Sequence, residues 1–495
     1  MLKKILIANR GEIALRVIRT CREMNIKTVA VYSEVDRTAL HVRMANEAVC
    51  IGPPAPAQSY LKIDAIIDAA KKTGAEAIHP GYGFLSEKSQ FAQAVNDAKL
   101  IFIGPPASAM RAMGDKLSSR RAMMKANVPV VPGLTDPVAD ADAAAREADK
   151  IGYPVALKAA GGGGGKGIRM VRDAKDLPAA FRTASGEAQS AFNDARIYIE
   201  RYLDKPRHIE VQIMGDSHGN VAAVGERECS IQRRHQKLIE ETPSPILNDT
   251  DRAAIQEAAV RAAKAVGYSN AGTVEFLWSG GKFYFLEMNC RLQVEHPVTE
   301  MAYSCDLVRE QIRVASGQKL SLRSNMKPRG SAIEVRVNAE DPEKQFMPSI
   351  GTIKNIRLPG GPNVRVDSGL YRGYEVTPYY DSLLAKIIVW APDRAQAIER
   401  MDRALCELHV GGVRTTAPLA LRVLRDSRFR AGDFDTHFLD GFAPVSDPER
   451  EEVVALIAAV HRHLGTSRRA LSDASQGGSN SNNTNPWAAS ARGRR

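Results

Sequence analysis

A glycine-rich loop between two short apolar runs is the segment of this chain best suited to phosphate chemistry. Residues 154–160 read as a strand, five consecutive glycines begin at Gly161, and residues 168–171 read as a second strand. Backbone N–H groups in such a loop can close over phosphates, and Lys158 at its root adds a positive charge. It is not a Walker A loop, since no Ser or Thr follows Lys166. The alternative is a flexible linker, but linkers usually mix Gly with Ser and do not join paired strands.

A second segment places two carboxylates on one predicted hairpin. Residues 272–278 and 283–289 read as strands joined by a turn that contains Gly280 and Gly281. A three-residue loop would set Glu275 directly opposite Glu287, where two carboxylates about 5 Å apart repel each other. A two-residue loop would shift the pairing by one residue. In the first case a divalent cation such as Mg²⁺ would remove the repulsion.

Polar side chains then occupy alternate positions from the second of these carboxylates onward. They are Glu287, Asn289, Arg291, Gln293 and Glu295. A period of two predicts an extended segment with all five on one face. Ordinary solvated charges on a half-exposed strand are the alternative. An acid, an amide, a cation, an amide and an acid in line favour a site for metal, phosphate and a small anion.

Between these segments lies a basic run, residues 233–237, which alone could be a nucleic-acid or targeting patch. Its neighbours favour small anions. Residues 200–203 end a strand, and His208 and Glu210 share one face of the next, which suits an adenine and ribose pocket. A lone histidine is more often structural, so His208 depends on this context.

Composition excludes several classes of protein. With 495 residues the chain is long enough for two to four domains. No apolar run approaches the roughly 18 residues that span a bilayer, and the N-terminus does not read as a signal peptide, so a cytoplasmic enzyme is expected. Six cysteines without a C-x-x-C pair argue against a zinc site or a disulfide framework. The net charge of +11 is spread among acidic residues rather than concentrated in one block.

The elements that must position these side chains follow from periodicity. Residues 1–112 alternate strand and helix, which predicts a parallel sheet, and their first turn lacks G-x-G-x-x-G, so we interpret them as a scaffold. A helix is expected over 115–126 and a second α/β region to about 317. Further strands are expected at 334–338 and 384–389, and further helices at 395–409, 416–425 and about 451–464. The residues from 472 onward should be disordered.

In this order the segments resemble the biotin carboxylase family of the ATP-grasp superfamily, over roughly residues 1–445. The resemblance is carried by residues 7–14, 79–87, 113–116, 161–167, 233–237, 287–289, 291–300 and 336–341. The last stretch lies outside the ATP-grasp core and favours this family over other ATP-grasp ligases. Two departures, Cys290 where many members have Thr and Lys166 where Arg is common, leave the implied roles intact.

The resemblance implies a role for each site residue. ATP would contact Lys116, Lys158, Gly163, Gly164, Gly165, Glu200, Leu203, His208, His235, Glu275 and Glu287. Mg²⁺, or Mn²⁺, would be held by Glu275, Glu287 and Asn289. Bicarbonate would be bound by Lys237, Arg291, Gln293 and Val294. Glu295 would take its proton, and Arg336 would stabilise the enolate of the biotin ureido group. Lys237, Arg291, Glu295 and Arg336 would form the catalytic set.

The implied fold is α/β, or α+β overall. It would comprise a Rossmann-like domain over 1–112, an ATP-grasp domain over 113–328 with a mobile lid at about 130–203, a C-terminal domain rich in antiparallel strands over 329–445, and a helix with a disordered tail over 446–495. The implied reaction is ATP-dependent carboxylation of biotin on a separate carrier protein, through carboxyphosphate. No biotin is expected on Lys125 or Lys327, the two lysines that follow a methionine closely enough to imitate a biotin site.

The implied partners are the biotin carboxyl carrier protein, carboxyltransferase subunits and a second copy of the chain. Neither nucleic acid nor a membrane is expected as a partner. Acetyl-CoA carboxylase, in fatty acid synthesis, is the expected complex, with pyruvate, propionyl-CoA and 2-oxoglutarate carboxylases as alternatives. Another ATP-grasp ligase and a basic nucleic-acid-binding protein are the remote alternatives.

Overall fold

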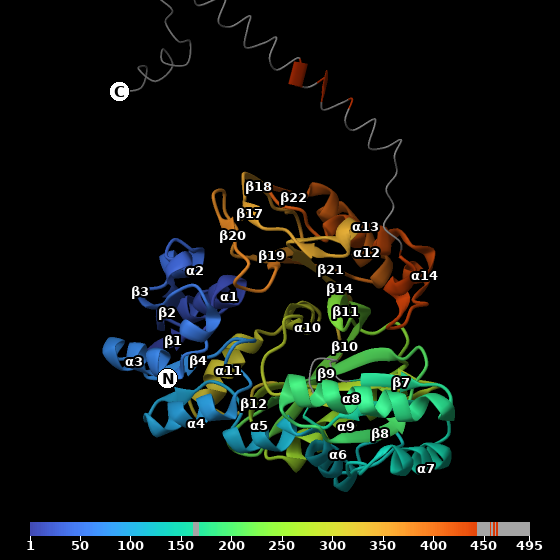
Figure 1. Ribbon diagram of the computed structural model, residues 1–495. Helices are drawn as coiled ribbons and strands as arrows, with labels where there is room; N and C mark the ends of the chain where they lie inside the picture. Colours follow the sequence, from blue (N-terminus) through green and yellow to red (C-terminus); the bar gives the residue numbers. More distant parts are fainter. Residues whose placement is uncertain (162–167, 443–455, 457–458, 461, 464–495) are drawn as a thin grey trace, which may run out of the picture. The chain divides into compact units, whose positions relative to one another are not determined.

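The computed structural model describes residues 1–161, 168–442, 456, 459–460 and 462–463 (Figure 1). Contacts between Cα atoms group Met1–Phe442 into one unit and Ala443–Arg495 into another. The described residues of the second unit are helical. The glycines Gly163 to Gly165, most of the predicted helix over 451–464 and the predicted tail lie outside the described residues.

The first unit begins with the expected parallel sheet, shown in blue in Figure 1. Its strand order is β3-β2-β1-β4-β5, and Ile5, Leu6 and Ile7 of the central strand are fully buried. The strands are β1 (Lys4–Ile7), β2 (Lys27–Ser33), β3 (Glu47–Gly52), β4 (Ala77–His79) and β5 (Ile101–Phe102). The helices are α1 (Gly11–Glu23), α2 (Leu40–Met44), α3 (Ile63–Thr73), α4 (Ser89–Asp97) and α5 (Ala107–Gly114).

A small antiparallel sheet with the order β7-β6-β8 follows, and it carries the root of the glycine loop. Its strands are β6 (Val155–Ala159), β7 (Ile168–Val171) and β8 (Ile197–Arg201), and the helices around it are α6 (Lys116–Lys125), α7 (Ala141–Ile151) and α8 (Leu177–Phe192). Asp115 begins α6 by accepting a hydrogen bond from the Ser118 backbone N–H at 2.7 Å, as an N-cap should. The two strands predicted to flank the glycines are therefore confirmed.

A large sheet of eight strands, in the order β13-β12-β9-β10-β11-β14-β21-β19, forms the centre of the unit. All its pairings are antiparallel. The strands are β9 (Arg207–Gly215), β10 (Val221–Arg233), β11 (Gln236–Thr242), β12 (Asn270–Ser279), β13 (Lys282–Asn289), β14 (Ser331–Asn338), β19 (Val364–Ser368) and β21 (Leu383–Ala391). The helices α9 (Asp249–Ala265), α10 (His296–Tyr303) and α11 (Leu307–Ala315) lie between these strands in sequence.

In the C-terminal part of the unit, α12 (Arg394–Glu407) packs against β14 and β21, and α13 (Ala417–Arg425) packs against β14. The short helix α14 (Ser427–Ala431) packs against α13. Three short pairs complete this part: β15 (Glu340–Asp341) with β16 (Met347–Pro348), β17 (Gly351–Thr352) with β20 (Glu375–Val376), and β18 (Asn355–Arg357) with β22 (His409–Gly411). The mixed α/β fold class is confirmed, as are the strands and helices predicted over residues 334–425.

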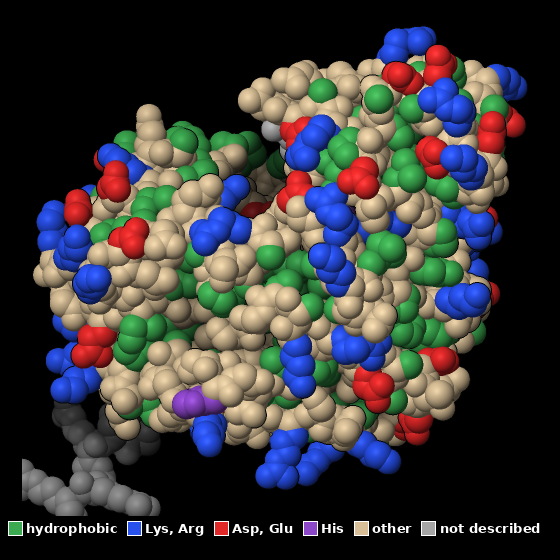
Figure 2. Space-filling view, turned by 90° about the horizontal axis from the view of Figure 1, so that it is seen from below, with side chains coloured by type: hydrophobic (Ala, Val, Ile, Leu, Met, Phe, Trp, Pro, Cys, Tyr) green, Lys and Arg blue, Asp and Glu red, His purple; other side chains and the backbone are tan. Residues whose placement is uncertain are grey.

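The surface and the cysteines agree with the composition. On the face in Figure 2 the Lys and Arg side chains are scattered among other residues, several of them beside Asp or Glu. All six cysteines are free. Among the residues that the structure describes, no helix is long and apolar enough to cross a membrane.

Candidate active site

One level of the large sheet carries a row of charged side chains across four neighbouring strands. Glu287 on β13 pairs with Glu275 on β12, Glu275 pairs with Glu210 on β9, and Glu210 pairs with Arg227 on β10. Paired residues of neighbouring antiparallel strands project from the same face. Glu210, Glu275 and Arg227 are buried, so their charges must be satisfied within the protein.

The β12–β13 hairpin reaches this pairing by a route that the sequence did not predict. Only Gly280 and Gly281 separate the strands, both with positive φ, so the loop has two residues and not three. The register shifts between Glu275 and Phe276, and Leu286 is left without a partner. This irregularity adds back the residue that the short turn removed, and Glu275 therefore faces Glu287.

Lys237 on β11 gathers the carboxylates of the row. Its Nζ lies 2.5 Å from Glu210 Oε2, 2.9 Å from Glu275 Oε1 and 2.7 Å from Glu295 Oε1. Burial alone would lower the pKa of Lys237, but these three carboxylates raise it well above its usual value. The ammonium group is thus fixed as a cation at the centre of the site.

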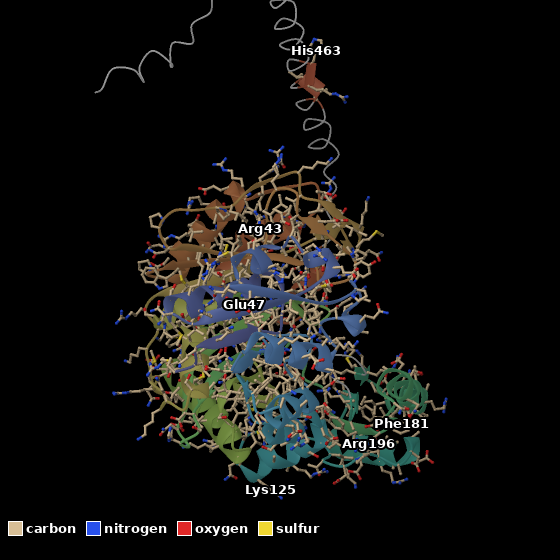
Figure 3. The ribbon with its side chains drawn as sticks, turned by 90° about the vertical axis from the view of Figure 1, so that its left-hand side faces the viewer. Arg43, Glu47, Lys125, Phe181, Arg196 and His463 are labelled. Carbon is tan, nitrogen blue, oxygen red and sulfur yellow. The ribbon has the colours of Figure 1, made fainter. Side chains whose placement is uncertain are left out.

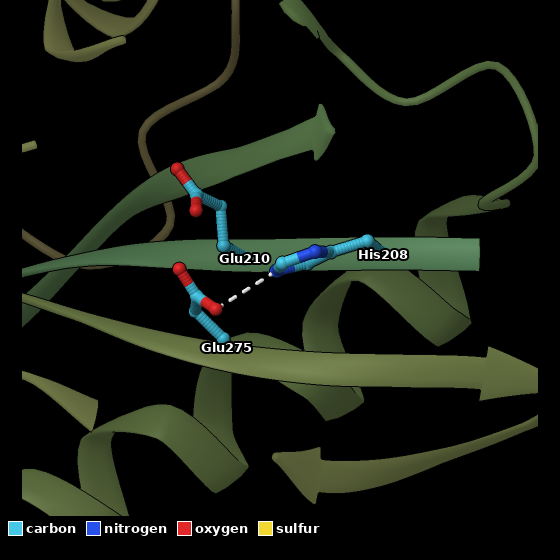
Figure 4. Close-up of side chains that lie close together, drawn as sticks. All are labelled: His208, Glu210 and Glu275. Atoms are coloured by element: carbon cyan, nitrogen blue, oxygen red, sulfur yellow. Dashed lines mark ion pairs between the residues drawn. The ribbon is translucent and has the colours of Figure 1, made fainter. Parts of the chain in front are cut away.

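His208 and Glu210 lie beside Glu275, as the close-up in Figure 4 shows. His208 Nε2 is 3.0 Å from Glu275 Oε2, and Arg227 Nε is 2.5 Å from Glu210 Oε1. The side chains of His208, Glu210 and Glu275 are close enough together to hold a metal ion. Because Lys237 and Arg227 already neutralise Glu210, this residue belongs to the ion-pair network and is a poor candidate for a metal ligand.

Glu275 and Glu287 fit a divalent cation better. Burial would raise the pKa of Glu275, but Lys237 and His208 hold it below its usual value. Burial and the charge of Glu275 both raise the pKa of Glu287, so the second carboxylate is the poorly stabilised one. Asn289 Nδ2 donates to Glu275 Oε1 at 2.8 Å, which puts the third predicted ligand beside the pair. A cation between the two carboxylates would relieve their repulsion.

The segment after Asn289 is not the extended strand that its period of two predicted. β13 ends at Asn289, the chain bends through Cys290 and Arg291, and Glu295 becomes the N-cap of α10 with φ −81° and ψ 11°. The prediction was wrong because the chain must turn here to enter a helix.

The polar side chains of this segment nevertheless converge. Arg291 Nη1 donates to Gln293 Oε1 at 2.6 Å, and Gln293 Nε2 donates to Glu275 Oε1 at 3.1 Å. Arg291 Nη2 donates to Asn289 Oδ1 at 3.1 Å. Glu87, from the N-terminal region, accepts from Arg291 Nε at 3.0 Å and from the Cys290 backbone N–H at 3.1 Å. The bends after Asn289 therefore bring these polar side chains together, which a straight strand would not.

Glu295 joins Lys237 to Arg336. Arg336 Nη2 lies 2.9 Å from Glu295 Oε2, and Arg336 Nε lies 2.6 Å from Glu240 Oε1. Burial would raise the pKa of Glu295, yet Lys237 and Arg336 lower it well below its usual value. Burial raises the pKa of Glu240 to about 7, against the opposing effect of Arg336. Of the two carboxylates on Arg336, Glu295 is the firmly ionised one.

The predicted nucleotide residues form a second group. Lys116, Lys158 and Glu200 line a cavity of about 20 Å³ together with Arg120, Tyr198, Phe285 and Leu286. Glu200 pairs with Lys158 and, at 3.2 Å, with Arg120. Burial and the nearby Lys158 lower the pKa of Lys116. Leu203 lies half-buried after β8, and His235 lies exposed in the β10–β11 turn.

Besides Arg227 of the charged row, the sequence reasoning did not assign Arg120, Glu240 or Glu87 to the site. Arg120 lies one helical turn after Lys116 on α6, a spacing that places both on one face. Glu240 is an acidic residue in a buried strand next to Lys237, and Glu87 belongs to a segment marked only by its family resemblance. The first two had a readable signal, whereas the third depended on a contact between distant parts of the chain.

Comparison with known proteins assigns the family. Family models described as "Biotin carboxylase, N-terminal domain", "Carbamoyl-phosphate synthase L chain, ATP binding domain" and "Biotin carboxylase C-terminal domain" match residues 1–110, 115–323 and 334–441. Biotin carboxylase 1 of Bacillus subtilis is 52% identical over 445 residues, which cover 89% of this chain and 99% of the relative. This chain belongs to the biotin carboxylase family.

Other members of the biotin carboxylase family are equally similar. One pyruvate carboxylase subunit, from Methanothermobacter thermautotrophicus, is 54% identical over 455 residues, covering 92% of this chain and 93% of the relative. A crystal structure of the biotin carboxylase domain dimer of Hydrogenobacter thermophilus 2-oxoglutarate carboxylase, in complex with MgADP, ADP and bicarbonate, superposes with a TM-score of 0.85. It is 49% identical and covers 89% of this chain and 97% of that chain. The resemblance inferred from the sequence is confirmed, and the fold is that of an ATP-dependent ligase.

Proposed function

We propose that this biotin carboxylase transfers the carboxyl group of bicarbonate to N1 of biotin on a separate carrier protein, with ATP cleaved to ADP and phosphate. The observation that carries the proposal is the position of Glu295, which lies between the Lys237 ammonium and the Arg336 guanidinium, within 2.9 Å of each. Glu295, the proposed base for bicarbonate, is thus in direct contact with Arg336, the proposed cation for the biotin ureido oxygen. This arrangement suits two consecutive half-reactions at one place.

Bicarbonate would lie among Lys237, Arg291, Gln293 and Val294. The two cations would neutralise the anion, and Gln293 and Val294 would orient it, so that one oxygen of bicarbonate attacks the γ-phosphorus of ATP while Glu295 accepts the proton. The low pKa of Glu295 keeps it ionised before the substrate arrives. An anion between Lys237 and Glu295 would weaken their ion pair and make Glu295 a stronger base.

The nucleotide would be held by Lys116, Lys158, Glu200, Leu203, His208 and His235, with the glycine loop over its phosphates. Mg²⁺, held by Glu275, Glu287 and Asn289, would supply charge neutralisation at the phosphates. Carboxyphosphate would then break down to CO₂ and phosphate. The phosphate released in that step would take the proton from N1 of biotin, Arg336 would stabilise the resulting enolate of the ureido group, and N1 would form a bond to the carbon of CO₂.

The same proposal covers the domain division and the partners. A Rossmann-like part over 1–112, an ATP-grasp part over 113–328 and a C-terminal part over 329–445 are supported by the three family matches. Within the ATP-grasp part, a lid would span about 130–203. The partners would be a biotin carboxyl carrier protein, carboxyltransferase subunits and a second copy of the chain, in the cytoplasm. The acceptor of the carboxyl group would be acetyl-CoA, with pyruvate, propionyl-CoA and 2-oxoglutarate as the alternatives.

The test is bicarbonate-dependent formation of ADP by the purified chain in the presence of free biotin, with carboxybiotin measured in parallel. Both products should form together, and omission of bicarbonate should abolish both. ADP formation that is independent of bicarbonate and biotin would instead indicate another ATP-grasp ligase. Co-purification of the chain from its own cells would identify the carboxyltransferase and hence the acceptor.

A further inference from the structure

Lys386 is a fully buried lysine on the same face of the large sheet as Arg336. It pairs with Arg336 across β14 and with Asp367 across β19. Its Nζ donates a hydrogen bond to the Val294 carbonyl oxygen at 2.6 Å. A buried charge costs free energy unless it is paired and hydrogen-bonded, so the partners of this lysine must stabilise it.

Two further neighbours of Lys386 come from the N-terminal part of the chain. Glu12 Oε1 on α1 lies 3.5 Å from Lys386 Nζ, and the Tyr82 ring centroid lies 5.8 Å from it. Glu12 and Tyr82 belong to residues 7–14 and 79–87, two segments of the resemblance to which no site role was attached. Among the described residues, both oxygens of Glu12 are buried without a hydrogen bond, and Lys386 is the cation that pairs with this carboxylate.

The Val294 carbonyl group can influence the position of Glu295. It belongs to the same planar peptide as the Glu295 backbone N–H, so a hydrogen bond that fixes the carbonyl also fixes the start of Glu295. Glu295 is the N-cap of α10, and its side chain extends from that peptide toward Lys237 and Arg336. Without Lys386 the described structure offers the Val294 carbonyl no other hydrogen bond, and the peptide could rotate.

We propose that Lys386, supported by Glu12, is a positioning residue that sets the Val294–Glu295 peptide and thereby the bicarbonate end of the active site. Lys386 is not among the residues proposed to contact bicarbonate or biotin. It acts through the backbone next to Glu295 and links the N-terminal part of the chain to the chemistry. The inference rests on the proposed roles of Val294 and Glu295 in bicarbonate binding and deprotonation.

The test separates the two substrates. Lys386→Met removes the hydrogen bond and also takes the cation away from Glu12, whose pKa burial raises to about 7. The double variant Lys386→Met/Glu12→Gln is the main probe because it removes both ionisable groups at similar volume. We expect the KM for bicarbonate to rise about 10- to 100-fold, by analogy with the loss of an outer partner at a metal site, while the KM for MgATP is unchanged. The measurement is initial-rate ADP formation with each substrate varied in turn.

Arg394→Met is the matched control. Arg394 on α12 pairs through Nε with Glu241 Oε2 at 2.6 Å, and its other hydrogen bonds in the described structure go to Glu241 Oε1 and to the Phe429 and Arg430 carbonyl oxygens. This variant should lower the melting temperature and leave both KM values unchanged. If it shifts the bicarbonate KM as the double variant does, the effect is general loss of stability and the inference is overturned.

Glu295→Ala, measured alongside, distinguishes failure of the inference from failure of the proposed function. If Glu295→Ala loses bicarbonate-dependent ATP cleavage and the folded double variant keeps the wild-type bicarbonate KM, only the role of Lys386 is refuted. If Glu295→Ala keeps that reaction, the proposed base is wrong and the inference loses its basis. An equal rise in the KM values for bicarbonate and MgATP in the double variant would also overturn the inference.

Discussion

Glu275 on β12 lies directly opposite Glu287 on β13 although only Gly280 and Gly281 join the two strands. The unpaired Leu286 restores a register that a two-residue turn would have shifted by one. In the unshifted register the two carboxylates would point to opposite faces of the hairpin. The irregularity therefore creates a close pair of acids in a largely buried place, which is unfavourable unless a cation lies between them.

Glu287→Gln should weaken the use of magnesium while sparing the fold. Loss of one of two metal carboxylates should raise the magnesium concentration needed for half-maximal ATP cleavage by about 10- to 100-fold, the range seen when support of a metal site is removed. The measurement is ADP formation at fixed ATP over a magnesium series, with circular dichroism to confirm folding.

Glu210→Gln is the informative comparison for the metal pair. Glu210 also pairs with Glu275 across the sheet, but its partners are Lys237 and Arg227. Its variant should change bicarbonate use more than magnesium use. A Glu287→Gln protein with the wild-type magnesium dependence would place the metal elsewhere.

Glu295→Ala and Arg336→Ala should separate the two half-reactions. Removal of the base should lower bicarbonate-dependent ATP cleavage by about 10²- to 10⁴-fold, the usual contribution of general base catalysis. Arg336→Ala should lose carboxybiotin formation and keep slow ATP hydrolysis, because its guanidinium prepares biotin rather than bicarbonate. Equal loss of both products in Arg336→Ala would contradict this division.

Arg336 should also set the acid limb of the pH profile. The pKa of Glu295 is held well below its usual range by Lys237 and Arg336, so Glu295 loses its charge only at low pH. In Arg336→Met the pKa of Glu295 should rise, and the residual bicarbonate-dependent ATP cleavage should fall off at a higher pH than in the wild type. The measurement is the rate of that reaction across the acid range.

Glu240 needs a control in the same experiment, because its pKa of about 7 falls within the pH range of the profile. Glu240→Gln in the wild-type and Arg336→Met backgrounds removes that titration. If Glu295 is the titrating group, Arg336→Met should still shift the acid limb to higher pH when residue 240 is Gln in both proteins. A profile that stops shifting once Glu240 is replaced would assign the acid limb to Glu240.

The sequence was sufficient for elements whose periodicity is local. Strands β6, β14 and β21 and helices α12 and α13 lie where apolar spacing placed them, with ends that differ by at most three residues. It was insufficient for Glu295, because alternation of residue types continued past Asn289 although the backbone turned into α10. Patterns of residue type do not reveal bends that are fixed by packing.

Contacts between distant segments were beyond the sequence reasoning for a different reason. Lys386 interrupts an apolar run in β21, which is a readable sign of a buried charge, but nothing in that run identifies Val294 or Glu12 as its partners. Those partners follow from the order β11-β14-β21 in the large sheet and from the position of α1 beside it. The site residues were found by their chemistry, whereas their support had to be read from the structure.

Neither lysine that imitates a biotin site should carry biotin. Biotinylated lysines lie at the tip of a carrier-domain hairpin, usually between two methionines. Lys125 follows Met124 but is the last residue of α6, at the outer edge of the view in Figure 3. Lys327 follows Met326 in the loop between α11 and β14, and Pro328 comes after it. Neither backbone matches the hairpin that a biotin ligase would require.

The 495-residue chain, expressed with a biotin ligase, should therefore give no signal with a streptavidin probe, and Lys125→Arg/Lys327→Arg should behave identically. It should still carboxylate free biotin, but slowly, because without a carrier the ureido group has to be bound and oriented by the active site alone. Adding a biotinylated carrier domain should raise the rate well above that given by the same concentration of free biotin. Mass-spectrometric detection of biotin on either lysine, or a rate that the carrier does not increase, would refute action on a separate carrier.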